Sequence, residues 1–109
     1  MTEIIKTELK NAVTQYTLWE DFCNSPLGVL WVNYTTGQNG KKIALVLNII
    51  SVQFYRRKKV ATKLLDCVSL EAETMITSSV SDDGGKEFSE KYGFKYNDKL
   101  NLWAYKKGD

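Results

Sequence analysis

The chain has 109 residues, 43% of them apolar and 26% charged, which is the composition of one globular domain spanning residues 1–109 and not of a disordered chain. No stretch approaches the roughly 20 apolar residues of a membrane-spanning helix, and the N-terminus lacks the order of a signal peptide, so we expect a cytoplasmic protein. There is no histidine, and Cys23 and Cys67 lack metal-ligand spacing, so we expect no metal site. The net charge of +2 is too small to argue by itself for a nucleic-acid partner, so any electrostatic signal must come from local clusters of charge.

The first part of the chain is typical of β-strands. Polar residues alternate with β-branched and aromatic ones in three segments, which are Ile4–Leu9, Ala12–Trp19 and Val29–Tyr34. Turn-forming residues separate the later segments, at Asn24-Ser25-Pro26 and at residues 36–40. The pattern predicts an antiparallel meander.

The next segment, Ile43–Val52, is almost continuously apolar. Such a run predicts a strand that is covered on both faces at the centre of a sheet. Only Asn48 and Ser51 interrupt it. Each is interpreted either as a polar group that bonds locally or as one that faces a ligand.

Helical spacing replaces the strand pattern in the second half of the chain. We predict a helix from Arg57 to Ala72, a strand at Met75–Val80 parallel to the central one, and a short second helix closed by Gly93. A hairpin of Phe94–Tyr96 and Leu100–Lys106 follows, with a turn at residues 97–99. This order predicts an α/β domain with a mixed sheet.

Four consecutive cations, Arg56, Arg57, Lys58 and Lys59, precede the first predicted helix. Positive charge opposes the dipole at a helix N-terminus. The run is therefore either a solvated basic segment or part of an anion site in which N–H groups, dipole and cations act together. Because the run follows a central strand, the helix begins at that strand's carboxyl end, where α/β sheets bind ligands. Phosphate is the natural anion.

Two stretches resemble the GNAT superfamily of N-acetyltransferases. Residues 55–65, YRRKKVATKLL, resemble its coenzyme A pyrophosphate loop, whose pattern is Arg/Gln-x-x-Gly-x-Gly/Ala after the central strand. Residues 86–94, KEFSEKYGF, resemble its second helix, where Phe-Tyr-x-Lys-x-Gly-Phe is typical. The resemblance implies a single mixed, mostly antiparallel sheet with splayed central strands and two main helices. The early strands are similar to those of short members that lack the helices between the first two strands.

The resemblance also implies an acetyl-CoA site. Arg56 would begin the loop, the backbone N–H groups from Arg57 to Thr62 would surround the pyrophosphate, and Lys58 and Lys59 would add charge. The main chain of the central strand would pair with the pantetheine arm. The implied cofactor-binding residues are Ile49, Ile50, Ser51, Arg56, Arg57, Lys58, Lys59, Val60, Ala61 and Thr62.

The sequence departs from the family pattern at two positions, one in the predicted pyrophosphate loop and one in the predicted second helix. Lys59 stands where the first glycine of the loop is usual, and a side chain there restricts close approach of the backbone. Ser89 stands where the family often has a tyrosine acid, so the candidates for a proton donor are Ser89, Tyr92 and water. Tyr92 also has a second interpretation as a core residue, because it shares a helix face with Phe88.

Two classes of function follow. The first is an acetyl-CoA-dependent N-acetyltransferase that acts on an amine, either a small molecule or a protein lysine, as a monomer or homodimer. The second is a non-catalytic binding module of the same fold that uses the basic patch Arg56–Lys59 to hold a protein or a nucleic acid.

Overall fold

The computed structural model describes residues 2–21, 24–51, 60–78 and 85–107. Its elements, in chain order, are β1 (Thr2–Glu8), β2 (Val13–Glu20), β3 (Gly28–Thr36), β4 (Lys42–Ser51), α1 (Val60–Glu71), β5 (Met75–Ser78), α2 (Gly85–Tyr92), β6 (Lys95–Asn97) and β7 (Leu102–Lys106).

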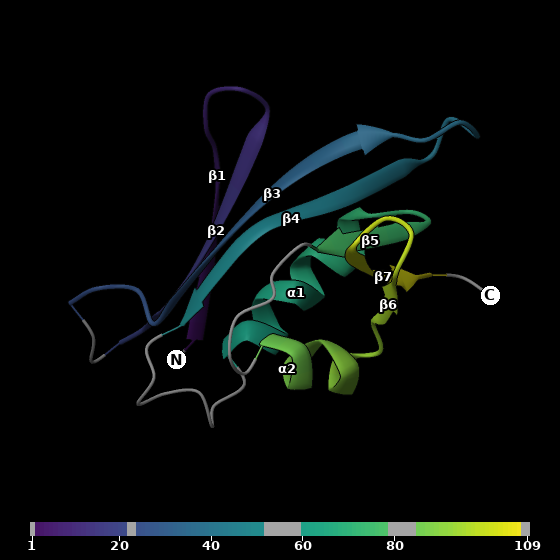
Figure 1. Ribbon diagram of the computed structural model, residues 1–109. Helices are drawn as coiled ribbons and strands as arrows, with labels where there is room; N and C mark the ends of the chain where they lie inside the picture. Colours follow the sequence, from purple (N-terminus) through teal and green to yellow (C-terminus); the bar gives the residue numbers. More distant parts are fainter. Residues whose placement is uncertain (1, 22–23, 52–59, 79–84, 108–109) are drawn as a thin grey trace.

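The seven strands form one sheet in the order β1-β2-β3-β4-β5-β7-β6 (Figure 1). All neighbouring pairs are antiparallel except β4 and β5, where Ile43–Val46 pairs in parallel with Met75–Ser78. The parallel pair follows from the crossover through α1, which returns the chain in the same direction. The predictions of an N-terminal meander and of a mixed sheet with two helices are therefore confirmed.

Most element boundaries agree with the predictions to within about two residues. One difference of two residues lies in the last hairpin, where β7 begins at Leu102 and not at Leu100. Its turn is longer than predicted because Asn101 takes a left-handed conformation, with φ of 54°, and Asn97 Oδ1 accepts the N–H groups of Lys99 and Leu100. The predicted ends of the first helix before Val60 and of the strand after Ser78 lie outside the described residues.

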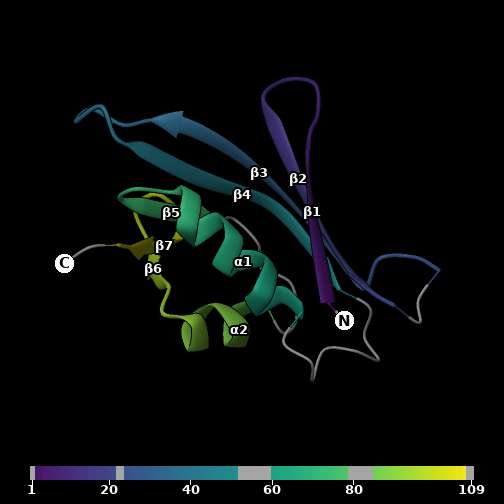
Figure 2. The same cartoon turned by 180° about the vertical axis from the view of Figure 1, so that it is seen from behind.

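The prediction that the central strand is covered on both faces is wrong. Along β4, Ala44 and Val46 are fully buried, whereas Leu45 is 37% and Ile50 53% exposed. Both helices lie on the same side of the sheet (Figures 1 and 2), as right-handed crossovers that proceed in one direction across a sheet require. In the part of the chain that the structure describes, no helix or strand packs on the opposite side, which we call the open face.

The core lies between the sheet and α1. The apolar stripe of α1 is buried at Val60, Leu64, Leu65 and Val68, as its helical spacing predicts. These side chains face the buried residues of β2, β3 and β4, among them Leu30, Val32 and Val46. This packing places the N-terminus of α1 against the carboxyl end of β4. No helix in the described ranges is long and apolar enough to cross a membrane.

Candidate functional site

The carboxyl half of β4 extends beyond its pairing with β5. The last described pair in that ladder is Val46 with Ser78, whereas β4 continues for five more residues, Leu47–Ser51, beside β3. The register between β3 and β4 shifts between Trp31 and Val32, which leaves Leu47 as the extra residue of a bulge. Beyond Leu47, β4 pairs only with β3 among the residues that the structure describes.

One main-chain N–H group in this part of β4 can be identified. The N–H of Ile49 donates to Oδ1 of Asn48 at 2.9 Å, a short-range contact at an exposed position. The amide is thus held by a neighbouring side chain, which a rotation about the Asn48 side-chain bonds would release. Of the two interpretations predicted for Asn48, a locally bonded polar group or one that faces a ligand, the structure shows the first. Ser51 is half-buried at the end of the strand.

Gly28, the first residue of β3, lies between the end of β4 and the beginning of α1. The Cα of Gly28 pairs with that of Ser51 across the β3–β4 ladder. A methyl group placed on Gly28 would lie 3.3 Å from the carbonyl oxygen of Ile50 and only 2.3 Å from Cγ1 of Val60. Because the glycine has no side chain, the helix start approaches this closely. The structure therefore brings two predicted groups together, the strand residues 49–51 and the helix residues 60–62.

The first turn of α1 carries no acidic residue. The backbone N–H groups of the first four helix residues have no partner within a helix, and they carry the positive end of the dipole. Val60 is buried, whereas Ala61 and Thr62 are half-buried. The four cations Arg56, Arg57, Lys58 and Lys59 lie outside the described residues, so their roles stay predictions.

The second predicted group, Ser89 and Tyr92, lies on α2. Ser89 is only 6% exposed, and its carbonyl oxygen accepts the N–H groups of Gly93 and Phe94, which closes the helix. Gly93 has the left-handed conformation that this ending needs, with φ of 116°. The structure thus explains Ser89 as a buried helix residue, and its proposed chemical role stays a prediction.

Tyr92 contributes to the packing of α2. Its ring lies in an aromatic cluster, with centroids 5.5–6.1 Å from those of Phe88, Phe94 and Tyr105. Its hydroxyl donates to Oδ1 of Asp66 on α1 at 2.9 Å. Burial, and then the hydrogen bond to Asp66, raise the pKa of Tyr92, so the phenol keeps its proton. Asp66 lies six residues after Val60, or roughly 9 Å along the helix axis.

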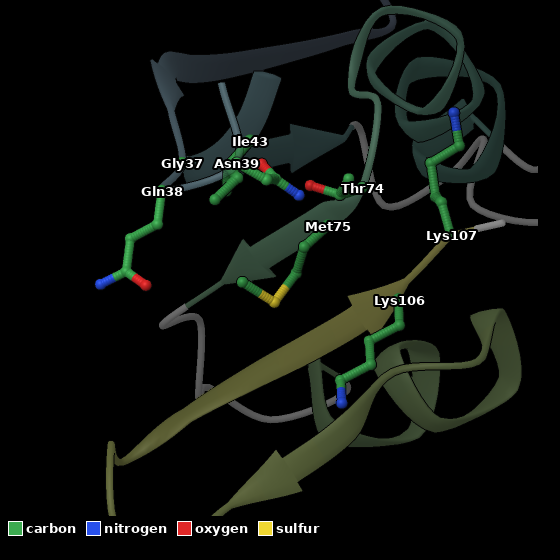
Figure 3. A pocket seen from close by; sticks show the side chains of 8 residues that line it. All are labelled: Gly37, Gln38, Asn39, Ile43, Thr74, Met75, Lys106 and Lys107. Atoms are coloured by element: carbon green, nitrogen blue, oxygen red, sulfur yellow. The ribbon is translucent and has the colours of Figure 1, made fainter. Parts of the chain in front are cut away.

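A depression of about 520 Å³ lies at the opposite end of the sheet (Figure 3). It is lined by Gly37, Gln38, Asn39, Ile43, Thr74, Met75, Lys106 and Lys107. Lys106 and Lys107 point in opposite directions there. Lys107 donates through Nζ to the carbonyl oxygens of Ala72, at 2.6 Å, and Ser69, and so caps α1. This depression contains none of the predicted site residues.

Sequence reasoning missed Gly28 and Asp66. A single glycine after Leu27 is typical of a turn, and nothing in the sequence indicates that a helix 32 residues later packs on it. Asp66 is an exposed acidic residue in a helix, and only the fold shows that it holds Tyr92.

No family model matches the chain, and no curated protein matches its sequence. Solved structures do match its fold. A GNAT-family acetyltransferase from Staphylococcus aureus Mu50 superposes with a TM-score of 0.68 at 13% identity, over 87% of this chain and 68% of that one. AtaTR bound with AcCoA gives 0.66 at 9% identity, over 87% and 68%. Arabidopsis thaliana Naa50 in complex with the bisubstrate analogue CoA-Ac-MVNAL gives 0.60 at 13% identity, over 87% and 72%. The fold of the chain is GNAT-like, and the chain is shorter than these three structures.

Proposed function

We propose that this GNAT-fold chain is an acetyl-CoA-dependent N-acetyltransferase that acts on an amine, with a protein lysine as one candidate acceptor. The observation that carries the proposal is the meeting of two main-chain donor sets at Gly28. The edge of β4 after Leu47 and the N-terminus of α1 lie side by side at the carboxyl end of the central strand.

The residues present suit the chemical groups of coenzyme A. A pyrophosphate is an anion, and the first turn of α1 offers N–H groups without a competing carboxylate. Arg56–Lys59, which precede it, would add positive charge. A pantetheine arm contains amides, and the β4 main chain at Ile49, Ile50 and Ser51 offers matching donors and acceptors. AtaTR and Naa50, two of the matched structures, hold AcCoA and a CoA analogue.

The cofactor would supply an activated thioester, and the chain would mainly position it. The Ile49 N–H would donate to the carbonyl oxygen on which negative charge develops, once it is released from Asn48. A hydroxyl on α2 would hold the proton that the leaving sulfur needs. Ser89 is one candidate, by its place in the family pattern. Tyr92 is the other, because a phenol is more acidic than a serine hydroxyl, although burial and Asp66 raise the pKa of Tyr92 and its proton is directed at Asp66.

Calorimetric titration with coenzyme A tests the cofactor assignment. The parent chain is expected to bind, and Lys58→Glu/Lys59→Glu is expected to weaken binding strongly at low salt. The matched control is Lys41→Glu/Lys99→Glu, which changes the net charge equally at exposed turn positions and should bind as the parent does. An absence of heat and of thermal stabilisation with millimolar coenzyme A would exclude the proposal.

Lys59→Gly separates this function from that of a basic binding module. A coenzyme A site should bind the cofactor equally well or better, because glycine allows a closer approach of the backbone to the pyrophosphate. A patch that holds an acidic partner by its charge should bind that partner less tightly after the loss of a cation.

A further inference from the structure

The open face of the sheet carries almost no charge. The strand registers place on it the residues that alternate with the buried ones, such as Trp31, Leu45 and Met75. Among the described residues of β2, β3, β4 and β5, those on this face are all apolar or uncharged polar. A sheet face in water normally carries polar and charged side chains in alternation with the core. This face therefore has the composition of a covered surface.

Two tryptophans on the open face donate hydrogen bonds to neighbouring polar side chains of the same face. Trp31 donates through Nε1 to Oε1 of Gln15 at 3.0 Å, and Trp19 donates through Nε1 to Oγ1 of Thr17 at 3.2 Å. Both tryptophan N–H groups are thus satisfied within the face. Ile5 at 42%, Leu47 at 42% and Ile50 at 53% exposure, with Leu45, extend the apolar surface across β1 and β4. A contiguous apolar surface of this kind marks an interaction site.

The face is large enough for a stable interface. The five strands β1 to β5 have 7, 8, 9, 10 and 4 residues, on average more than seven. At a strand spacing of about 4.8 Å and a rise of about 3.3 Å per residue, they cover roughly 550 Å² in projection. Two such faces in contact would bury roughly 1,100 Å² in total, and the surface of the protruding side chains adds to this value. A biological interface needs about 1,000 Å² in total.

Charges on the described part of the face lie only on its outer strands: Glu3 at one corner, Lys106 at the diagonally opposite one, and Lys95 on β6, at the same edge as Lys106 and level with Leu45. Glu3, exposed on β1, pairs with Trp19 beyond the level of Ile50, at the carboxyl end of β4. Lys106, exposed on β7, pairs with Met75 beside Ile43, at the amino end of β4. The Lys106 corner is also where the depression of Figure 3 lies, with Ile43 and Met75 in its lining. One corner is therefore acidic, and the diagonally opposite one is basic and hollow.

We infer that the open face binds a second copy of this chain in a two-fold symmetric dimer. A two-fold axis that lies between the sheets, at right angles to the line from Glu3 to Lys106, exchanges these two corners. Each Glu3 then faces the depression beside Lys106 of the other copy, and the uncharged centres meet without like-charge repulsion. The strands of the two sheets cross at a large angle in this arrangement, which is one of the two ways in which sheets pack face to face.

Sedimentation velocity over a concentration series tests the dimer. The parent chain is expected to associate in the micromolar range, and Leu45→Glu, at the centre of the face, is expected to weaken association at least a hundredfold, because it buries an unpaired charge. Leu70→Glu is the matched control, since Leu70 is 87% exposed on α1, and it should dimerise as the parent does. Circular dichroism checks that each variant is folded. If Leu45→Glu does not fold, Leu47→Lys is used in its place.

The corners provide a second test that uses only exposed positions. At low salt Glu3→Lys and Lys106→Glu should each weaken dimerisation about tenfold, and the double reversal should restore it to within about threefold of the parent. Three results would overturn the inference. The parent chain could stay monomeric even at concentrations 100-fold above the micromolar range, the dimer could survive Leu45→Glu, or the effects of the two charge reversals could simply add. Coenzyme A binding is measured separately on the monomeric variant, so the outcome is independent of the proposed function.

Discussion

Replacement of Gly28 by alanine tests the close approach of α1 to the sheet. The added methyl group would lie 2.3 Å from Cγ1 of Val60 and 3.1 Å from Cδ1 of Leu64. Carbon atoms in contact prefer a separation of about 3.5–4.0 Å, so the start of α1 must move outward by more than about 1 Å. Val60 is 1% exposed and has no free space in which to turn its side chain.

Two opposing effects set the size of the loss. Overpacking a core costs about 1–3 kcal/mol, whereas the replacement of glycine in an ordinary strand conformation stabilises by about 0.4–1 kcal/mol through the unfolded chain. We therefore expect Gly28→Ala to lower the free energy of unfolding by about 1–2 kcal/mol. Urea denaturation followed by circular dichroism measures this difference.

Val60→Ala provides the control for this prediction. Alone it should destabilise by about 1–3 kcal/mol, because it removes two buried methyl groups. Combined with Gly28→Ala it also removes the clash, so the double variant should be about 1–2 kcal/mol more stable than the sum of the single changes predicts. Parental stability of Gly28→Ala, or strict additivity in the cycle, would refute the packing described for this end of the helix.

Three further predictions concern the other helix, the tyrosines and the chemistry. Gly93→Ala should lower the free energy of unfolding by about 1–3 kcal/mol, because residue 93 has φ of 116° and the methyl would lie 3.0 Å from Cε2 of Tyr105. Gly40→Ala is the control: with φ of 78° and no neighbour within 4 Å, it should lower the free energy of unfolding by less. Thermal denaturation of both variants measures the difference. Burial, and then the hydrogen bond with Tyr16, raise the pKa of Tyr34 above the 10.0 of a free tyrosine. Above pH 10.0 the unfolded chain therefore loses this proton while the folded chain keeps it, so the free energy of unfolding should be constant below pH 10.0 and fall as the pH rises above it. Tyr34→Phe should flatten that decline in urea midpoints, and an unchanged pH profile would contradict the assignment. If Ser89 donates the proton in acetyl transfer, Ser89→Ala should lower turnover by roughly ten- to a thousandfold at constant coenzyme A affinity, whereas the same loss in Tyr92→Phe alone would assign that role to Tyr92.

The parts of the fold that local patterns determine were predictable from the sequence. Three predictions rest on short-range signals: the strand at Ala12–Trp19, the helical stripe from Val60 to Val68, and the closing of the second helix by Gly93. The structure has each of them, with the strand at Val13–Glu20. The parallel pairing of β4 with β5 was predictable as well, because a helix crossover permits few alternatives.

The open face was not predictable from the same signals. A continuous apolar run such as that of β4 is typical of a strand with two covered faces, and it does not show that no described helix or strand covers the second face. The packing on Gly28 and the bond from Tyr92 to Asp66 join residues 32 and 26 positions apart, so they depend on the assembled fold. For the candidate site, the sequence identified the strand end and the helix start, but the contact between them is a property of the structure.

The most direct test of the proposed cofactor site is an amide nuclear magnetic resonance titration of the assigned chain with coenzyme A. The account predicts that the N–H signals of Ile49 and Ser51 and those from Val60 to Thr62 shift together and saturate at one stoichiometric equivalent, while those of β1 stay constant. Shifts confined to the depression beside Ile43 and Lys106, or no saturable shift at residues 49–51 and 60–62, would contradict it.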